Sequence, residues 1–486
     1  MKARRAYKPT TPFGGILPIL KTLREYGVPQ LINRCLGERP KQSRYAYSDT
    51  FIGWTVATLC GGSSLLHISK YKKKLSIIPG LKVPSHDTLG RVMKKLSEEV
   101  KTTHSVTHKA KASIVYSDYD DNLKMNNMLI KATKRVKALQ ENRSYTMDID
   151  ATFIPTECRG AIRKYDKKGR LNYNKIGFNP MVCLIGDLPV FFSMRNGDAN
   201  AKFRFKECLE DCFSLLDRSK IKVGRVISDA AGYHKKALDM LDSKGIKFNV
   251  RFPYTSKMEE FKTNLRKSRD WRPTVIETAN FYWDCEIADI PYKMWDYKFG
   301  KNTKISNTWR VVAIRIPTDE TFRRIETPDK VLHRQRVRKK MLQLRDKKLL
   351  KEPGKAYTDI HWKEINGYVY KFFMTNDFVT TSEGIVLEYN RRGNAERKFS
   401  FMKKDYAWRL PPFMNMNENT VFMIAAAFAN NMFRGMVNIF KKEIPQLRSN
   451  ARLPDFRETF IFVHCERLID GTFEFCNTDI CFEKIV

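Results

Sequence analysis

Residues 145–152, with the sequence Tyr-Thr-Met-Asp-Ile-Asp-Ala-Thr, alternate regularly between apolar and polar side chains. A period of two residues is typical of a β-strand that buries one of its faces. Asp148 and Asp150 then lie on the same polar face of the strand. We therefore expect a strand that presents two carboxylates on one side.

The segments after this strand have an order of their own. Residues 180–185 and 189–194 are strand-like and are joined through Gly186-Asp187, a tight hairpin signal. The patterns then predict a helix over 203–217, a strand over 225–228, a helix over 233–244 and a strand over 247–252. Three strands, a helix, a strand, a helix and a strand are the order of an RNase H-like fold. The predicted fold class is therefore α/β with an RNase H-like catalytic core.

Other patterns divide the 486 residues into regions around this core. A helical region precedes the core, a mostly β stretch rich in Trp and Tyr interrupts it, and a hairpin turned at Asp470-Gly471 follows it. The predicted boundaries are 1–140 for a helical DNA-binding region, 141–260 for the first part of the core, 261–372 for the β-rich insertion, 373–440 for the second part of the core, and 441–486 for the C-terminal hairpin region, a candidate dimer contact. This length fits two to four domains at roughly 100 to 200 residues each.

The chain carries a large excess of positive charge. Lys and Arg number 89 against 53 Asp and Glu, which gives a formal net charge of +36. Such an excess repels itself in a compact fold unless a polyanion neutralises it, and nucleic acid is the expected polyanion. Hydrophobic residues make up 42% of the chain, a share that excludes a disordered protein.

Membrane insertion and secretion are not expected. The longest apolar run, 421–429, is half the length of the 18 or so residues that cross a bilayer. Ten cysteines without any Cys-x-x-Cys pair indicate reduced thiols and argue against a zinc site. We therefore expect a cytoplasmic protein with a buried apolar helix over 419–440.

A basic helix is predicted after Pro84, with Ser85 as its N-cap. Its apolar stripe consists of Leu89, Val92, Met93 and Leu96, and its basic residues off that stripe are Arg91, Lys94 and Lys95. Two interpretations stay open: a helix-turn-helix element that binds DNA through these cations, and an ordinary surface helix with solvated lysines. For a basic loop predicted over 156–175 the alternatives are contact with DNA beside the metal ions and a solvated loop, and for a basic segment over 331–351 they are contact with DNA phosphates and a solvated surface helix.

Three carboxylates stand out by their place in the predicted fold: Asp150 on the first strand, Asp229 just after the fourth, and Glu396 on a late helix. The first and fourth strands of an RNase H-like sheet are adjacent, so the two aspartates would converge, and a helix across the sheet could add the glutamate. Hard oxygen ligands suit Mg²⁺ or Mn²⁺, with two ions per active site. Asp148 shares a strand face with Asp150, so either of them could be the ligand, although Thr152 favours Asp150.

The late helix, predicted over 382–404, has a mixed polar stripe. Tyr389, Arg392, Glu396 and Lys403 are separated by three, four and seven residues. At about 100° per residue, one continuous helix would place all four within an arc of roughly 60°. An acid for metal and cations for the flanking phosphates suit a helix that lies along a DNA strand.

These residues resemble a known family. The spacing Tyr389-x2-Arg392-x3-Glu396-x6-Lys403 resembles the Tyr-Arg-Glu-Lys signature of the DDE insertion-sequence transposases of the IS4-type superfamily. Asp150-Ala151-Thr152 is similar to the first Asp-x-Thr of that family, and 229–233 is similar to its second aspartate with small residues and a trailing aromatic. A Pro-Ser-x-Asp-Thr-x-Gly-Arg stretch over 84–91 is similar to one upstream motif of a subgroup.

The resemblance implies cut-and-paste transposition. The protein would cut an insertion sequence at its terminal inverted repeats and join it to target DNA, as a homodimer and without a small-molecule cofactor. Several members of the family use a tryptophan of the insertion to stack on a flipped base. The candidates here are Trp271, Trp283, Trp295 and Trp309. Two alternatives stay open, an RNase H-like DNA nuclease or resolvase and a domesticated DNA-binding protein without catalysis.

Overall fold

The computed structural model describes residues 9–107, 113–165, 171–253, 271–277, 282–293, 296–298, 301–303, 308–317, 364–365, 368–392, 394–444, 447–468, 470–476, 480 and 482. The contacts between residues divide the chain into two compact units. Unit 1 consists of Met1–Gly224 and Asn394–Val486, and unit 2 is Arg225–Gly393. The two units do not follow the five predicted regions, because the N-terminal helices and the segment Asn394–Val486 share one hydrophobic core.

Six helices of unit 1 precede the central strands. They are α1 (Ile16–Glu25), α2 (Val28–Leu36), α3 (Tyr47–Leu59), α4 (Leu66–Leu75), α5 (His86–Leu96) and α6 (Leu123–Arg135). The predicted helix after Pro84 is confirmed as α5, and Ser85 is its N-cap, since its side chain accepts a hydrogen bond from the Thr88 N–H. The structure also has a hairpin that the sequence patterns did not predict, formed by β2 (Lys101–Thr107) and β3 (Ser113–Asp120).

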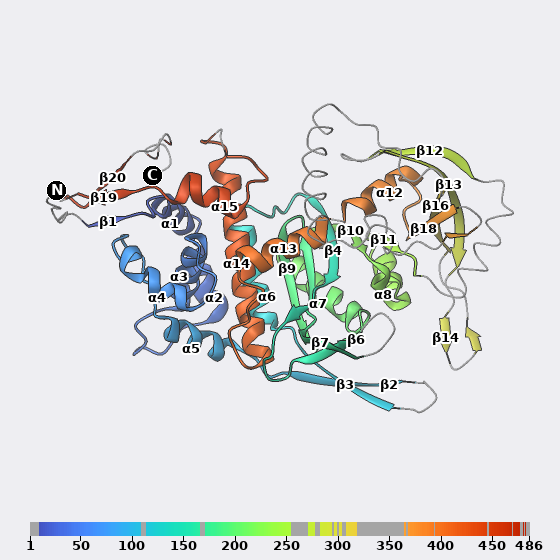
Figure 1. Ribbon diagram of the computed structural model, residues 1–486, viewed down its shortest axis with the longest axis horizontal. Coiled ribbons are helices and arrows are strands. Elements are labelled where there is room, and N and C mark those ends of the chain that lie inside the picture. Colours follow the sequence, from blue (N-terminus) through green and yellow to red (C-terminus); the bar gives the residue numbers. More distant parts are fainter. Residues whose placement is uncertain are drawn as a thin grey trace, which may run out of the picture. The chain divides into compact units, whose positions relative to one another are not determined.

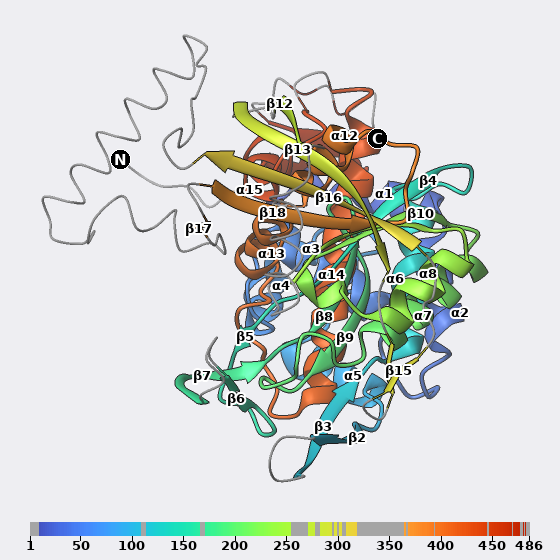
Figure 2. The same cartoon turned by 90° about the vertical axis from the view of Figure 1, so that its right-hand side faces the viewer.

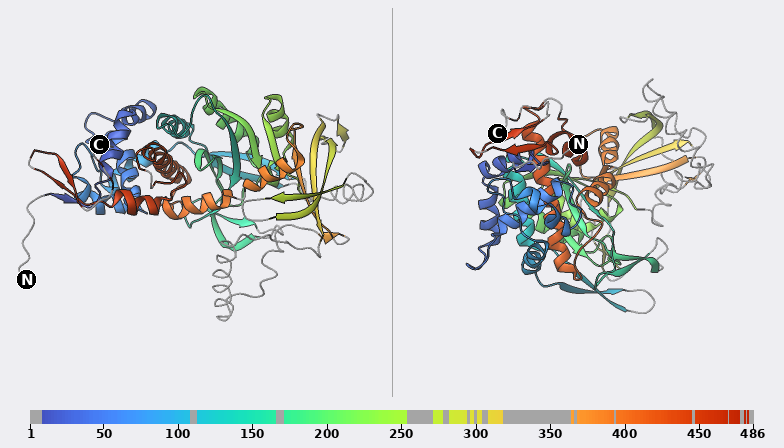
Figure 3. Two further views of the ribbon diagram at one scale, coloured as in Figure 1. Left: turned by 90° about the horizontal axis from the view of Figure 1, so that it is seen from above. Right: turned by 60° about the vertical axis from the view of Figure 1, so that its left-hand side comes forward.

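The long helix α14 (Met416–Phe440) lies at the centre of unit 1. It packs beside α6 and the N-terminal helices (Figures 1 and 3), where Phe428 contacts Phe51 and Phe422 contacts Trp54. Its length and composition alone would allow it to cross a membrane, but its most apolar window is 94% buried inside the protein. The prediction of a buried apolar helix is therefore confirmed.

The sheet of unit 1 consists of antiparallel strands in the order β4-β8-β9-β3-β2. Its predicted members are β4 (Ser144–Ala151), β8 (Met181–Ile185) and β9 (Leu188–Arg195), with Gly186 in the left-handed turn between the last two. Helix α7 (Phe205–Arg218) packs on β8 and β9. Strand β10 (Lys222–Ser228) begins in unit 1, where a Cβ on Gly224 would lie 2.4 Å from the Ser144 hydroxyl oxygen at the start of β4.

The prediction of a loop over 156–175 is wrong in part. Residues 156–161 are irregular, but the later described residues form β6 (Ile162–Tyr165) and most of β7 (Leu171–Phe178). Strand β7 pairs with β6 on one side and with β5 (Ile154–Pro155) on the other. The cause is local: Gly177 lies so close to the Ile154 carbonyl that a Cβ there would be 2.0 Å from its oxygen. Only glycine lets the two backbones approach in this way.

Unit 2 contains a mixed sheet in the order β12-β13-β16-β18-β11-β10. Strands β10 and β11 (Lys247–Arg251) are parallel and frame helix α8 (Lys235–Ser243), while the others pair antiparallel. The insertion supplies β12 (Arg272–Glu277), β13 (Tyr282–Lys293), β14 (Asp296–Lys298), β15 (Lys301–Thr303), β16 (Thr308–Pro317), β17 (Glu364–Ile365) and β18 (Tyr368–Thr375). Figure 2 shows β13, β16 and β18 side by side. The described residues of the insertion are mostly in strands, as predicted. The basic segment 331–351 lies outside the described residues.

The single helix predicted over 382–404 is wrong. The structure has α12 (Ser382–Arg391) in unit 2 and α13 (Asn394–Asp405) in unit 1, with Arg392 as the C-cap of α12. Gly393 stands between them in the sequence, and glycine is the residue that most often follows a helix end.

The chain ends of unit 1 meet in a small sheet. Strand β19 (Cys465–Arg467) pairs with β1 (Thr10–Thr11) and with β20 (Phe473–Phe475). The hairpin between β19 and β20 turns at Asp470-Gly471, as predicted. A short helix, α15 (Leu453–Phe456), precedes this sheet.

Candidate active site

Strand β4 carries both candidate carboxylates, and the predicted strand is confirmed, but its burial does not alternate. Met147 and Ile149 are fully buried, and Asp148 and Asp150 occupy the alternate positions. Asp148 is also buried, and its Oδ2 accepts a hydrogen bond from Lys398 Nζ at 3.0 Å. Asp150 is more exposed, and its Oδ1 accepts from the Ala151 N–H at 2.8 Å.

Helix α13 is attached at two points, once to β4 and once to the residues just after it. Lys398 binds Asp148, and Lys403 Nζ donates to the Phe153 carbonyl oxygen at 3.0 Å, three residues beyond Asp150. Phe399 and Met402, which lie between these lysines in the sequence, are buried. Glu396 belongs to this helix, seven residues before Lys403, so its Cα lies on the same side of the helix axis as that of Lys403. The Glu396 side chain is outside what the structure describes.

Asp229 follows β10 directly in unit 2. It caps a single 3₁₀ turn, Ala230–Gly232, and its Oδ1 accepts from the Ala231 N–H at 2.8 Å. The turn packs tightly, because a Cβ on Gly232 would lie 2.7 Å from the Ser228 Cβ. The Ala231 N–H thus orients the Asp229 carboxylate, and Gly232 lets the turn lie close to Ser228.

Tyr389 and Arg392 lie at the end of α12, on a different helix from Glu396 and Lys403. The predicted 60° arc does not apply, because it assumed one continuous helix. The Tyr389 ring packs against Phe373 of β18 with 4.8 Å between ring centroids. The arrangement of the four residues thus depends on two helices rather than on helical periodicity.

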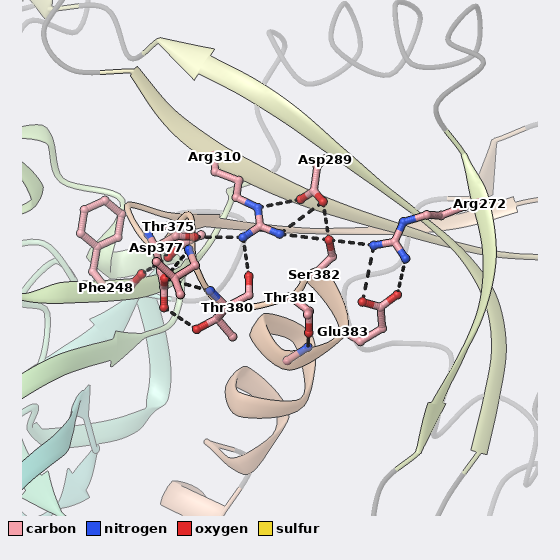
Figure 4. Close-up of polar contacts among 12 residues, drawn as sticks. Phe248, Arg272, Asp289, Arg310, Thr375, Asp377, Thr380, Thr381, Ser382 and Glu383 are labelled. Carbon is pink, nitrogen blue, oxygen red and sulfur yellow. Dashed lines mark hydrogen bonds and ion pairs between the residues drawn. The ribbon is translucent and has the colours of Figure 1, made fainter.

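A polar network that the sequence did not reveal holds the start of α12 on the insertion strands (Figure 4). Arg310 of β16 binds Asp289 of β13 at 2.8 Å, Ser382 Oγ at 3.0 Å, and two carbonyls of the loop before α12. Arg272 of β12 binds Glu383 at 2.7 Å. These residues occupy ordinary alternating strand positions, so no motif marked them in advance.

A second part of this network fixes the loop between β18 and α12. Asp377 accepts hydrogen bonds from the Val379 and Thr380 backbone and from Arg225. Burial by itself raises the pKa of Asp377, but these hydrogen bonds, with one from the Thr380 side chain, hold it well below its usual range. A carboxylate that stays ionised in this way anchors the helix that carries Tyr389 and Arg392.

The basic face of α5 has the predicted arrangement. Its apolar stripe is buried, and Arg91, Lys94 and Lys95 are exposed. Lys94 lies 4.0 Å from Glu418 and over the Phe413 ring, so part of its charge is compensated inside unit 1.

The candidate tryptophans differ in their surroundings. Trp309 is 1% exposed, donates from Nε1 to Asp242 and packs edge-on against Phe248, so it cannot stack on a base in this fold. Trp271 is partly exposed, with the Arg315 guanidinium 4.4 Å from its ring centroid. Trp283 lies on β13, and its side chain and the whole of Trp295 are outside the described residues.

The described residues contain no cluster of three or more His, Cys, Asp or Glu side chains that could hold a metal ion. The Glu396 side chain is not among those residues. The donors on β4 and after β10 are carboxylate oxygens, which are the chemistry that Mg²⁺ and Mn²⁺ prefer.

Comparison with known proteins identifies the class. A model of the transposase DDE domain family matches residues 141–432, more than half of the chain. The chain therefore belongs to the transposase DDE domain family. No curated protein matches it.

Two solved structures of transposases are similar over part of the chain. One is the piggyBac transposase synaptic complex with hairpin DNA, at 11% identity and a TM-score of 0.37, covering 93% of this chain and 81% of that chain. The other is the Mos1 strand transfer complex, at 13% identity and a TM-score of 0.16, covering 47% of this chain and 66% of that chain. TM-scores this low do not define the fold of the present chain.

Proposed function

We propose that this protein is a DNA transposase that cuts an insertion sequence at its terminal inverted repeats and joins it to target DNA. Membership of the transposase DDE domain family supplies the reaction class. The observation that supports the site best is the attachment of α13 to β4 and to the residues just after it through Lys398 and Lys403. It brings the helix that carries Glu396 beside the strand that carries Asp150.

Asp150, Asp229 and Glu396 are the proposed catalytic acids and metal ligands. The choice of Asp150 over Asp148 is supported by the ion pair, because Lys398 already neutralises the buried Asp148 carboxylate at 3.0 Å. Asp229 is oriented by the Ala231 N–H. When bound, two Mg²⁺ or Mn²⁺ ions would stabilise the attacking and leaving oxygens of an in-line phosphoryl displacement.

The core that holds these acids is proposed to be RNase H-like. In support, β4, β8, β9, α7, β10, α8 and β11 follow each other in the predicted order. Within unit 1, the start of β10 lies against the start of β4 at Gly224 and Ser144. The spacing of Tyr389, Arg392, Glu396 and Lys403 supports a place among the IS4-type elements.

DNA is the proposed partner, consistent with the formal charge of +36. Tyr389, Arg392 and Lys403 would contact the strand near the scissile phosphate. The exposed Arg91, Lys94 and Lys95 of α5 would contact duplex DNA further away. Two copies would hold two DNA ends in a synaptic homodimer, and the protein would act in the cytoplasm on the nucleoid.

The test is an incubation of the protein with Mg²⁺ and labelled DNA that carries the terminal repeats of its own element. Joined products are expected for the native protein. Nicks without joining would indicate a nuclease or resolvase, and a shifted but uncut band would indicate a binding protein.

Variants of the three acids sharpen this test. D150A, D229A and E396A should each abolish cleavage and keep DNA binding, because metal ligands act on the chemistry while the basic surface supplies affinity. D217A removes an exposed acid at the end of α7 and is the matched control. Cleavage retained in D150A and lost in D148N would show that Asp148 is the ligand instead.

A further inference from the structure

All the charged side chains that line a hollow of about 440 Å³ in unit 1 are positive. It lies where the segment between α2 and α3, helix α4 and the first half of α5 meet. Its charged lining residues are Arg39, Arg44, Lys72 and Arg91. Among the residues that the structure describes, no Asp or Glu lines it.

The hydrogen bonds of these cations leave their charge uncompensated. Arg39 donates to the Tyr45 carbonyl oxygen at 2.7 Å, and Arg91 donates to the Asp87 carbonyl oxygen at 3.4 Å. Carbonyl oxygens are neutral acceptors. Within the described part of the chain, none of the four cations forms an ion pair with a carboxylate, whereas Lys82 nearby does pair with Asp49 at 3.8 Å.

The chemistry of the lining fits one kind of ligand. Cations gathered around one hollow repel each other, and a bound anion relieves that repulsion. Ser43, Ser85 and Thr88 also line the hollow. The Ser85 and Thr88 hydroxyls bond each other at 3.0 Å, so the Ser43 hydroxyl and one hydroxyl of this pair stand beside the charges as hydrogen-bond donors. A phosphate group has acceptor oxygens and negative charge, which matches both properties.

We propose that this hollow binds a phosphodiester group of the DNA backbone. The inference rests on the proposed function in that DNA is the substrate, and it assigns to the DNA interface three residues that no sequence motif indicated, Arg39, Arg44 and Lys72. It also specifies the role of Arg91 at the DNA, as a contact to a phosphate. Lys94 and Lys95 of the same helix do not line the hollow.

The contact is independent of DNA sequence, so the test needs no knowledge of the terminal repeats. Binding of the full-length protein to a labelled duplex of arbitrary sequence is measured by fluorescence anisotropy over a range of salt concentrations. EDTA is present, so that no cleavage interferes. The test variant is R44A/R91A, because both side chains are exposed and their loss opens no cavity. The control is K73A/K74A, which removes the same charge from exposed positions next to Lys72 on α4.

Each lost phosphate contact lowers the slope of log affinity against log salt by about 0.9. R44A/R91A removes two cations from one phosphate site and should therefore lower the slope by about 0.9 and reduce affinity at 0.1 M salt roughly 8-fold. K73A/K74A should leave the slope unchanged, and R44K/R91K should restore most of it, since it keeps both charges. Circular dichroism melting confirms that the variants are folded.

Two outcomes would overturn the proposal: an unchanged slope in R44A/R91A, or an equal loss in K73A/K74A, which would mean a general effect of net charge. The result is separate from the test of transposition. A protein that binds through this hollow but never cuts its own repeats would keep this inference and refute the proposed function. Normal cutting with an unchanged slope would refute only this inference.

Discussion

The ion pair between Asp148 and Lys398 should hold α13 in place, so replacing either residue by an uncharged one should destabilise this helix. The two side chains are 11% and 13% exposed, so each charge has little access to water. Breaking a buried pair by removing one partner costs about 3 to 5 kcal/mol. K398M should reach this range, because the short Asp148 side chain cannot move its charge to solvent. D148N should cost less, about 2 kcal/mol, since the long lysine can extend toward water.

The double variant D148N/K398M removes both charges and should cost less than the sum of the single variants by about 2 to 3 kcal/mol. Amide hydrogen exchange of α13 is the assay, because it reports opening of this helix alone. K404M, at an exposed position of the same helix, is the control and should stay within about 0.5 kcal/mol of the native protein. Additive effects of the two single variants would refute the argument, since they would mean that the charges do not stabilise each other.

Three further predictions concern DNA and pH. R392A and K403A should each remove about one phosphate contact and so make the affinity for the cleaved DNA end less dependent on salt, as measured by fluorescence anisotropy. An unchanged slope of log affinity against log salt would place these residues away from the DNA. W271A should still nick the first strand but stall before double-strand release, as a time course on end-labelled duplex would show. W309A should instead destabilise the fold by about 3 to 5 kcal/mol, measured by thermal melting, because Trp309 is buried. Burial raises the pKa of Asp120 to about 7 from 3.8, so the folded state holds a proton that the unfolded state has lost, and stability should fall by about 3 kcal/mol as pH rises from 4 to 7. Unfolding of D120N should lack this dependence, and an identical pH profile in both proteins would contradict it.

Local patterns predicted the elements whose apolar and polar residues repeat regularly in the sequence. Strand β4 alternates with period two, and α5 keeps an apolar stripe at helical spacing, so both could be placed from a few residues. The hairpin of β2 and β3 was missed because its residues 101–107 include few apolar positions. Its place depends on pairing with β9, a contact distant in sequence.

The break between α12 and α13 shows a different limit. Charged and apolar positions continue at helical spacing across Gly393, so periodicity alone favours one helix. A glycine inside a helix costs only about 1 kcal/mol, which tertiary contacts easily outweigh in either direction. Here the network around Arg310 and Asp377 fixes α12, and the lysines of α13 fix the next helix separately. Neither set of contacts has a signal in the local sequence.

The choice between Asp148 and Asp150 could not be made from the strand, because both lie on one face. It depends on Lys398, a residue 250 positions away from Asp148. A second contact of α13 concerns the role of Lys403. Lys403 binds the Phe153 carbonyl in this structure, yet an ammonium carries three N–H groups, so one such bond is compatible with a phosphate contact. A lysine that both fastens α13 to the end of β4 and binds the scissile strand would couple the position of Glu396 to the presence of DNA. Replacement of Lys403 by alanine would then weaken DNA binding and loosen α13 together, whereas R392A should weaken binding alone.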